Sequence, residues 1–255
     1  MNVGLNTRGG RMLAGGIGAG AVVAVGAAGL SVFCGLNECR APVDYEVCVH
    51  DGVTLVEGLA GECRAPVDFA EFLDRPLTDA QGAPVVVSLA DPVDDLAPEE
   101  DVTTCATYEA KTTAGWYALS GAARRREAYF TRACGALQML VQAQQPRVSY
   151  FVEGGLELAD VANMPMTDMP RIGPGAPGEY ADATVAADGP WQWKITGRAT
   201  ELTIQEIAHA DFDRDGYGDV LAFVALGARG GTAAAGAPAL IEKRSADGPA
   251  RMRMR

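Results

Sequence analysis

An acidic turn between two β-compatible segments constrains the fold more than any other feature of the sequence. Residues 200–207 alternate apolar and polar side chains, and residues 220–226 form a continuous apolar run. Both patterns are typical of strands. Between them, residues 211–219 place four aspartates in nine positions. The sequence therefore predicts a strand–loop–strand hairpin whose loop must accommodate a high density of negative charge.

The spacing of these aspartates is that of a calcium loop. Ca²⁺ takes about six to eight oxygen ligands, and alternate residues of a tight loop can point their side chains at one ion. We predict a structural Ca²⁺ held by the carboxylates of Asp211, Asp213, Asp215 and Asp219 and the backbone carbonyl of Tyr217. Gly216 takes the positive φ that reverses the chain. The alternative is an acidic turn with no ion, because Asp and Gly are ordinary turn formers.

The flanking strands decide which kind of calcium loop this is. An EF-hand needs a Glu twelve positions into the loop, and that position is Ala222. With strands on both sides, residues 200–227 instead resemble the FG-GAP or VCBS-type calcium loops of integrin-like proteins. Those families usually build propellers from several copies, whereas this chain carries one. The resemblance therefore implies the loop and not the propeller.

An uncharged N-terminal segment predicts export. Residues 12–36 contain no charged residue and follow Arg8 and Arg11. This pattern predicts a transmembrane helix with residues 1–11 in the cytoplasm and the bulk of the chain periplasmic or extracellular. The alternative is a secretory signal cleaved near residues 25–27. Either interpretation places the rest of the chain outside the cytoplasm.

The small residues of the same segment predict that it packs against another helix. Gly16 and Gly20 form one small-xxx-small pair, and Gly20 and Ala24 form another. Such pairs let two helices approach closely within a membrane. We therefore expect a membrane protein partner to pack against this helix.

The cysteines and the charge balance agree with export. The chain has 21 Lys and Arg against 33 Asp and Glu, a net charge of −12, so nucleic acid is not an expected partner. Six cysteines need pairing in an oxidising compartment. The disulfide candidates are Cys39, Cys48, Cys63, Cys105 and Cys134, and Cys34 lies apart from them at the edge of the predicted membrane span. One pairing has a structural argument, Cys105 with Cys134, and the rest stay open. Zinc is the weaker alternative, because no pair has Cys-x-x-Cys spacing.

The remaining patterns predict an α+β fold. Residues 37–73 form a Cys-containing neck in which Glu-Cys-Arg-Ala-Pro-Val-Asp occurs twice, at 38–44 and 62–68. Residues 74–250 form the exported domain, and residues 251–255 form a basic tail. Within the domain we expect a helical hairpin, with helices from about 103 to 121 and 124 to 144, and a small antiparallel sheet that carries the calcium loop.

Three consecutive arginines begin the second predicted helix: Arg124, Arg125 and Arg126. This is the unfavourable end of the helix dipole for positive charge. They mark either a partner contact or a solvated charge cluster.

The functional prediction follows from export without a catalytic motif. The sequence contains no Gly-x-Ser-x-Gly, no phosphate-binding loop and no dinucleotide fingerprint, and we expect no enzyme. We predict a membrane-anchored periplasmic structural or interaction protein, an accessory subunit of a membrane complex, with structural Ca²⁺. The alternative is a soluble periplasmic binding or inhibitor module released from a cleaved signal.

Overall fold

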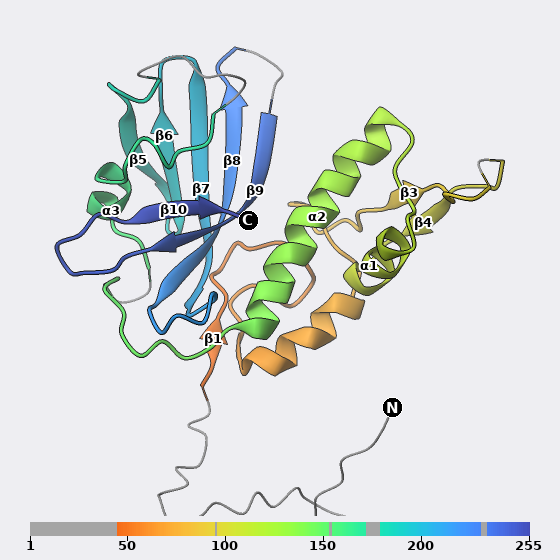
Figure 1. The fold of residues 1–255 in the computed structure, drawn as a ribbon, viewed down its shortest axis with the longest axis horizontal. Helices are drawn as coiled ribbons and strands as arrows, with labels where there is room; N and C mark the ends of the chain where they lie inside the picture. The colour runs from red at the N-terminus through yellow and green to blue at the C-terminus, as the bar shows by residue number, and fades with distance from the viewer. Residues whose placement is uncertain (1–44, 95, 153–154, 172–178, 231–233) are drawn as a thin grey trace, which may run out of the picture. The chain divides into compact units, whose positions relative to one another are not determined.

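A six-stranded antiparallel sheet organises the C-terminal half of the chain (Figure 1). The computed structural model describes residues 45–255 except 95, 153–154, 172–178 and 231–233. The strands lie in the order β10-β9-β8-β7-β6-β5, so each pairs with its neighbours in sequence. Their bounds are β5 Thr184–Gly189, β6 Gln192–Thr196, β7 Thr200–Ala210, β8 Asp219–Ala228, β9 Ala234–Glu242 and β10 Arg251–Met254.

The predicted hairpin is confirmed and forms the centre of this sheet. β7 and β8 pair from Thr200 and Ala228 at one end to Ala210 and Asp219 at the other. A single irregularity in the register lies between Glu206 and Ala208. The acidic loop is therefore the direct connection between the two longest strands of the sheet.

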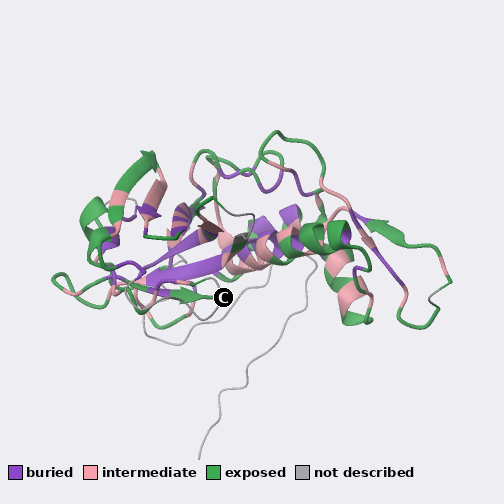
Figure 2. Ribbon diagram, turned by 90° about the horizontal axis from the view of Figure 1, so that it is seen from above, coloured by how far each residue is buried: buried purple, intermediate pink, exposed green. Residues whose placement is uncertain are grey.

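Each face of the sheet packs against its own hydrophobic core. Neighbouring side chains on a strand point to opposite faces. On β8, Leu221 joins the core that contains the long helices, whereas Val220 and Ala222 join the core on the other side. Their partners on β9 divide in the same way, Leu240 in the first core and Ile241 in the second. Figure 2 shows the central strands as buried between these two layers.

Four helices accompany the sheet in the part of the chain that the structure describes. Their bounds are η1 Pro66–Asp74, a 3₁₀-helix, and α1 Cys105–Thr113, α2 Gly121–Gln142 and α3 Leu158–Ala162. Hydroxyl caps begin the two longer α-helices: Thr104 accepts from the Thr107 amide at 3.2 Å, and Ser120 accepts from the Ala123 amide at 3.0 Å. These caps satisfy amides that have no partner within the helix.

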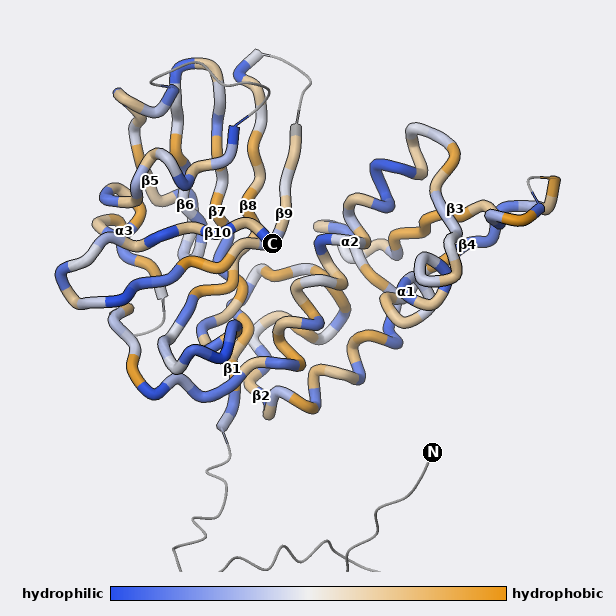
Figure 3. Tube along the Cα trace, in the orientation of Figure 1, coloured by the Kyte–Doolittle hydropathy of each residue, from blue (hydrophilic) through white to orange (hydrophobic). Residues whose placement is uncertain are grey.

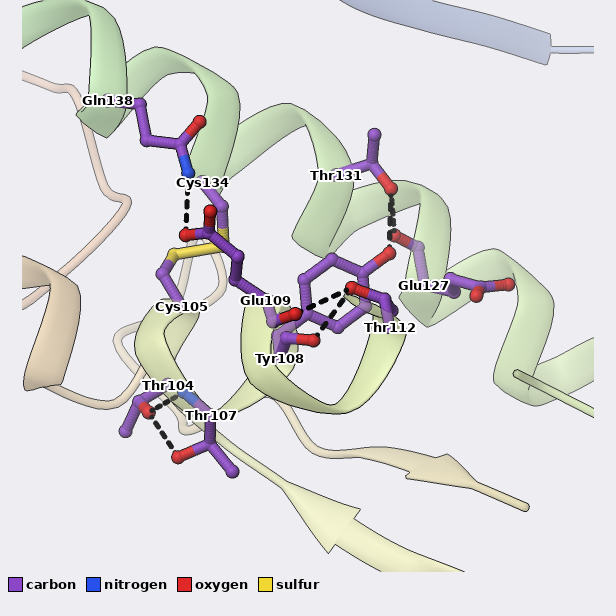
Figure 4. Close-up of a disulfide and its surroundings, with 10 residues drawn as sticks. All are labelled: Thr104, Cys105, Thr107, Tyr108, Glu109, Thr112, Glu127, Thr131, Cys134 and Gln138. Carbon is purple, nitrogen blue, oxygen red and sulfur yellow. Dashed lines mark hydrogen bonds between the residues drawn. A yellow bond between two sulfur atoms is a disulfide. The ribbon is translucent and has the colours of Figure 1, made fainter. Parts of the chain in front are cut away.

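The predicted helical hairpin and its disulfide are confirmed (Figure 4). Cys105 at the start of α1 is bonded to Cys134 in α2, and the Tyr108 hydroxyl lies 3.0 Å from that of Thr131. The first helix ends at Thr113, earlier than predicted, because Gly115 takes a φ of +91°. α2 begins at Gly121, before its predicted start, because Ser120 provides the N-terminal cap, and it ends at Gln142.

Residues 45–73 do not form the separate neck that the sequence predicts. β1 Val47–Cys48 pairs with β2 Cys63–Arg64, and a disulfide joins the directly paired residues Cys48 and Cys63. The His50 amide donates to the Ile207 carbonyl of β7 at 2.8 Å. Eight apolar residues of this segment are buried in the helical core: Val47, Val49, Val53, Leu55, Val56, Leu59, Phe69 and Phe72. The segment is therefore part of the domain.

The second copy of the duplicated motif and the C-terminal tail both lie within regular secondary structure. The second copy leads into η1, with its proline in the first turn, and the first copy lies outside the described residues. The tail forms β10, and its Met252 is buried against the sheet. A further two-stranded arm, β3 Val87–Leu89 with β4 Glu100–Val102, projects beyond the helices in Figure 1.

The structure corrects the predicted fold class. Within the described part of the chain, no helix combines the length and the apolarity that a membrane span needs. The predicted transmembrane helix, residues 12–36, lies outside that part, so a fold that includes one is not supported. The sheet is also not small: the six-stranded meander forms because residues 184–254 supply six consecutive strands.

One buried carboxylate lies on β7, away from the acidic loop. Glu206 is fully buried, and its two oxygens accept from the Trp193 indole N–H at 2.8 Å and the Leu156 amide at 3.1 Å. Gly155 beside it has no room for a side chain, because a Cβ there would lie 2.1 Å from the carboxylate. Burial raises the pKa of Glu206 from 4.5 to about 7.

This raised pKa predicts a stability that falls as the pH rises. Between pH 4.5 and about 7, folded Glu206 keeps a proton that the unfolded chain has released, so unfolding becomes easier with increasing pH. The loss is on the order of 3 kcal/mol across this window. Glu206→Gln should reduce that dependence, although it also loses the Leu156 bond. Urea unfolding at pH 5 and pH 8 measures the difference.

A matched variant on the same strand is Glu201→Gln, because that side chain is only partly buried. It should keep the pH dependence of the natural sequence. An identical dependence in Glu206→Gln and Glu201→Gln would contradict the prediction.

Candidate metal centre

Three loop carboxylates converge at the end of β7 and β8. Asp211, Asp213 and Asp215 each offer an oxygen, and these oxygens lie within 4.8 Å of one another. Figure 3 shows this connection between β7 and β8 as a hydrophilic stretch. Three carboxylates at this spacing are geometrically able to hold one cation.

Asp211 fixes the conformation of the loop. Its side chain accepts from the backbone amides of Arg214 at 2.7 Å, Asp215 at 3.2 Å and Gly216 at 2.8 Å. Gly216 has the predicted positive φ, +92°, and Arg214 is also left-handed at +67°. The Asp215 carboxylate accepts from the Tyr217 amide at 2.9 Å. The loop backbone is therefore shaped by its own hydrogen bonds.

Residues 144–148, which follow α2, form backbone hydrogen bonds with the loop. Gln144 and Asp211 exchange two backbone hydrogen bonds, each 2.9 Å long. The Gly216 carbonyl accepts from the Arg147 amide at 2.9 Å, and the Gly218 amide donates to the Val148 carbonyl at 2.8 Å. These bonds attach both halves of the loop to residues 144–148, so the loop is part of the folded body.

Gly218 allows close packing at the end of the loop. His209 Nε2 lies 3.1 Å from the Ser149 hydroxyl. A Cβ on Gly218 would lie 2.7 Å from that nitrogen and 2.8 Å from that hydroxyl. This serine–histidine pair packs directly on the loop backbone, which explains the glycine and favours a structural role for the pair.

Asp219 lies outside the converging triad but beside it. It is fully buried, and one oxygen accepts from the Phe212 amide at 3.1 Å. The other oxygen, Oδ1, is buried and has no hydrogen-bond partner among the described residues. Burial, then the charges of Asp213, Glu242 and Asp215, raise the pKa of Asp219 to about 7. A cation at this position would relieve both the missing contact and the repulsion.

Two arginines from the neighbouring hairpin contact the loop. Arg244 forms ion pairs with Asp215 and, at 2.7 Å, with Glu242. Arg253 pairs with Asp213 at 2.5 Å and lies 2.6 Å from Glu242 Oε1, without hydrogen-bond geometry to that oxygen. Burial alone would raise the pKa of Asp215, but the Tyr217 amide and Arg244 outweigh it and lower that pKa.

Sequence reasoning missed Glu242, Arg244 and Arg253. They reach the loop only because β9 pairs with β8 and β10 pairs with β9. No local motif marks them, and Glu242 lies opposite Asp219 only through the register of the β8–β9 pair, which the loop motif does not encode. The ring of Tyr217 is flanked by Arg244, 4.9 Å from its centroid. The role of its carbonyl as a ligand stays a prediction.

The other predicted site residues divide into three groups. Four cysteines form the two disulfides, Cys48 with Cys63 and Cys105 with Cys134, as is typical of extracellular or periplasmic proteins. The remaining cysteine candidate and the predicted helix-packing residues lie outside the described residues: Cys39, Gly16, Gly20 and Ala24. The three arginines at the start of α2 are exposed: Arg124, Arg125 and Arg126.

Comparisons of the chain with protein-family models, with curated proteins and with solved structures found no match. A function is therefore argued from the geometry of the chain's own residues.

The hydrogen bonds of the loop predict unequal roles for its aspartates. In the presence of a chelator, Asp211→Ala should lower the free energy of unfolding by about 1–3 kcal/mol, because three backbone amides lose their acceptor. Asp213→Ala should cost less, since its carboxylate accepts from an exposed arginine and adds to the repulsion. Urea unfolding in EDTA compares the two variants. Equal losses would refute a special role for Asp211.

Proposed function

We propose that this chain is an exported structural or interaction protein in which a Ca²⁺ bound by the β7–β8 loop stabilises the fold. The observation that carries the proposal is the convergence of Asp211, Asp213 and Asp215 in a loop whose backbone is already held in shape. The buried, unpartnered oxygen of Asp219 beside them supports it. These residues would hold the ion, which would supply the positive charge that this cluster needs.

The donor set favours Ca²⁺ over the other common metal ions. All proposed ligands are oxygens, whereas structural zinc sites use cysteine and histidine. Mg²⁺ requires near-ideal octahedral geometry and usually keeps several waters. A loop that offers several carboxylates and a carbonyl suits the larger and less demanding Ca²⁺.

Periplasmic or extracellular export fits this role. Free Ca²⁺ at millimolar concentration is available to extracellular modules, whose sites bind in the range of about 10⁻⁴–10⁻³ M. The two disulfides belong to the same oxidising environment. Of the two oxidising locations, periplasmic and extracellular, we propose the periplasm.

Two exposed features support an interaction role. The loop between β3 and β4 presents Val93 and Leu96, each 92% exposed, beside the acidic Asp91 and Asp94. These are the most exposed large apolar side chains among the described residues, and a partner that covered them would bury apolar surface. On α2, the exposed arginines 124–126 are a candidate contact for an anionic partner in a chain of net charge −12.

The stabilising role of the ion predicts a calcium-dependent melting temperature. Binding to the folded state alone adds roughly 2.7 kcal/mol when free Ca²⁺ is a hundredfold above its dissociation constant. EDTA should therefore lower the melting temperature, and CaCl₂ should restore it. Asp215→Asn should melt lower in CaCl₂ and lose most of the response, because it removes a charged ligand.

Asp182→Asn is the matched control for this experiment. Asp182 is an exposed acidic residue whose partner is Arg198, away from the loop. It should melt and respond to Ca²⁺ as the natural sequence does. A melting temperature that is the same in EDTA and in excess CaCl₂ would contradict the proposed function.

A further inference from the structure

We propose that Glu242 is a further ligand of the calcium site and that Arg244 and Arg253 are internal counter-charges which the ion displaces. Because a cation must bind the loop in the first place, the inference rests on the function proposed above. The loop would then have two charge states, one paired with arginines and one holding the ion.

The register of the sheet brings Glu242 to the site. Glu242 on β9 is the direct partner of Asp219 on β8. Directly opposed residues in an antiparallel pair have Cβ atoms about 4.5–5.5 Å apart and share a face of the sheet. Glu242 therefore lies next to the fully buried Asp219 at the base of the loop.

Two carboxylates at this position have an oxygen without any polar partner in the described chain, and a third, Glu242, has an oxygen that meets an arginine only as an ion pair. Asp213 Oδ1, Asp219 Oδ1 and Glu242 Oε1 are buried and make no hydrogen bond within the described residues. A buried acceptor without a partner costs about 1–3 kcal/mol, and more when it is charged. Arg253 Nη2 lies within 2.6 Å of both Glu242 Oε1 and Asp213 Oδ2, so these two carboxylates adjoin one another. Three such carboxylates together present the oxygens that a hard cation needs.

The two arginines each bridge a loop aspartate to Glu242. Arg253 contacts Asp213 and Glu242, and Arg244 contacts Asp215 and Glu242. Two guanidinium groups cannot neutralise the five carboxylates gathered here, which are Asp211, Asp213, Asp215, Asp219 and Glu242. The arginines therefore compensate the site only in part.

Arg244 and Arg253 are also able to release their carboxylate partners without disturbing the fold. Their side chains are 43% and 48% exposed for Arg244 and Arg253. The guanidinium groups are open to water although the carboxylates of Asp213 and Glu242 are mostly buried, so solvent can take up the arginines when they release these carboxylates. Glu242 would then turn its free oxygens to the ion. By linkage, whatever weakens the arginine pairs must strengthen ion binding by the same free energy.

Calorimetric titration of CaCl₂ into the full chain tests this coupling. Arg244→Gln and Arg253→Gln should each bind Ca²⁺ about threefold more tightly than the natural sequence, because the competing pair is absent. Glu242→Gln should bind about tenfold more weakly, because it loses a charged ligand.

A control separates displacement from a general change of charge. Arg251→Gln removes the same charge from β10, where the side chain is 58% exposed and pairs with Asp168 instead of a loop carboxylate. Its affinity should stay close to that of the natural sequence. Circular dichroism in EDTA confirms that all variants are folded.

The outcomes distinguish the two proposals. No binding to the natural sequence or to any arginine variant would overturn the proposed function and this inference together. Binding that Asp211→Ala abolishes, with Arg244→Gln and Arg253→Gln no tighter than Arg251→Gln, would overturn the inference alone. Unchanged affinity in Glu242→Gln would also overturn it.

Discussion

Repulsion among carboxylates at the end of the central hairpin is the constraint on which the rest of this structure depends. The β7–β8 turn places Asp211, Asp213 and Asp215 within 4.8 Å of one another, and Asp219 is fully buried beside them. Like charges this close in a poorly solvated place are unfavourable unless positive charge or protons compensate them. The surrounding elements are arranged around that requirement. Arginines supply part of the compensation, and we propose that Ca²⁺ supplies the rest.

The fold makes this arrangement rigid. The hairpin lies between two hydrophobic cores, one on each face of the sheet. The chain after α2 bonds to both halves of the loop at residues 144–148. On the other side, β9 and β10 bring Glu242 and Arg253 alongside. Because these supports come from distant parts of the sequence, an ion at the loop would stabilise the whole sheet rather than a single turn.

Local patterns in the sequence were sufficient for some of these features. The alternation in residues 200–207 and the apolar run in 220–226 correctly indicated the hairpin, and helical spacing correctly indicated the bridge from Cys105 to Cys134. Both depend on contacts between neighbouring elements. The converging aspartates also follow from the spacing of one short loop.

Features that depend on tertiary pairing could not be predicted. Glu242 and Arg253 join the site through strand register, for which the sequence holds no local signal. Residues 45–73 looked like a neck because of their duplicated motif, yet their apolar side chains fill the helical core. A long uncharged segment suggested a membrane span, but an apolar pattern alone does not establish one, and no helix in the described chain meets the requirement.

A crystal structure of the protein grown in CaCl₂, with anomalous data collected at long wavelength, tests directly whether the β7–β8 loop holds calcium. We expect an anomalous peak at the loop, with oxygens of Asp211, Asp213, Asp215, Asp219 and Glu242 bound to the ion directly at about 2.3–2.6 Å or through one bridging water. We also expect Arg253 to have turned away from Asp213. A loop without a peak, with Arg253 still paired to Asp213, would contradict a calcium site at this loop.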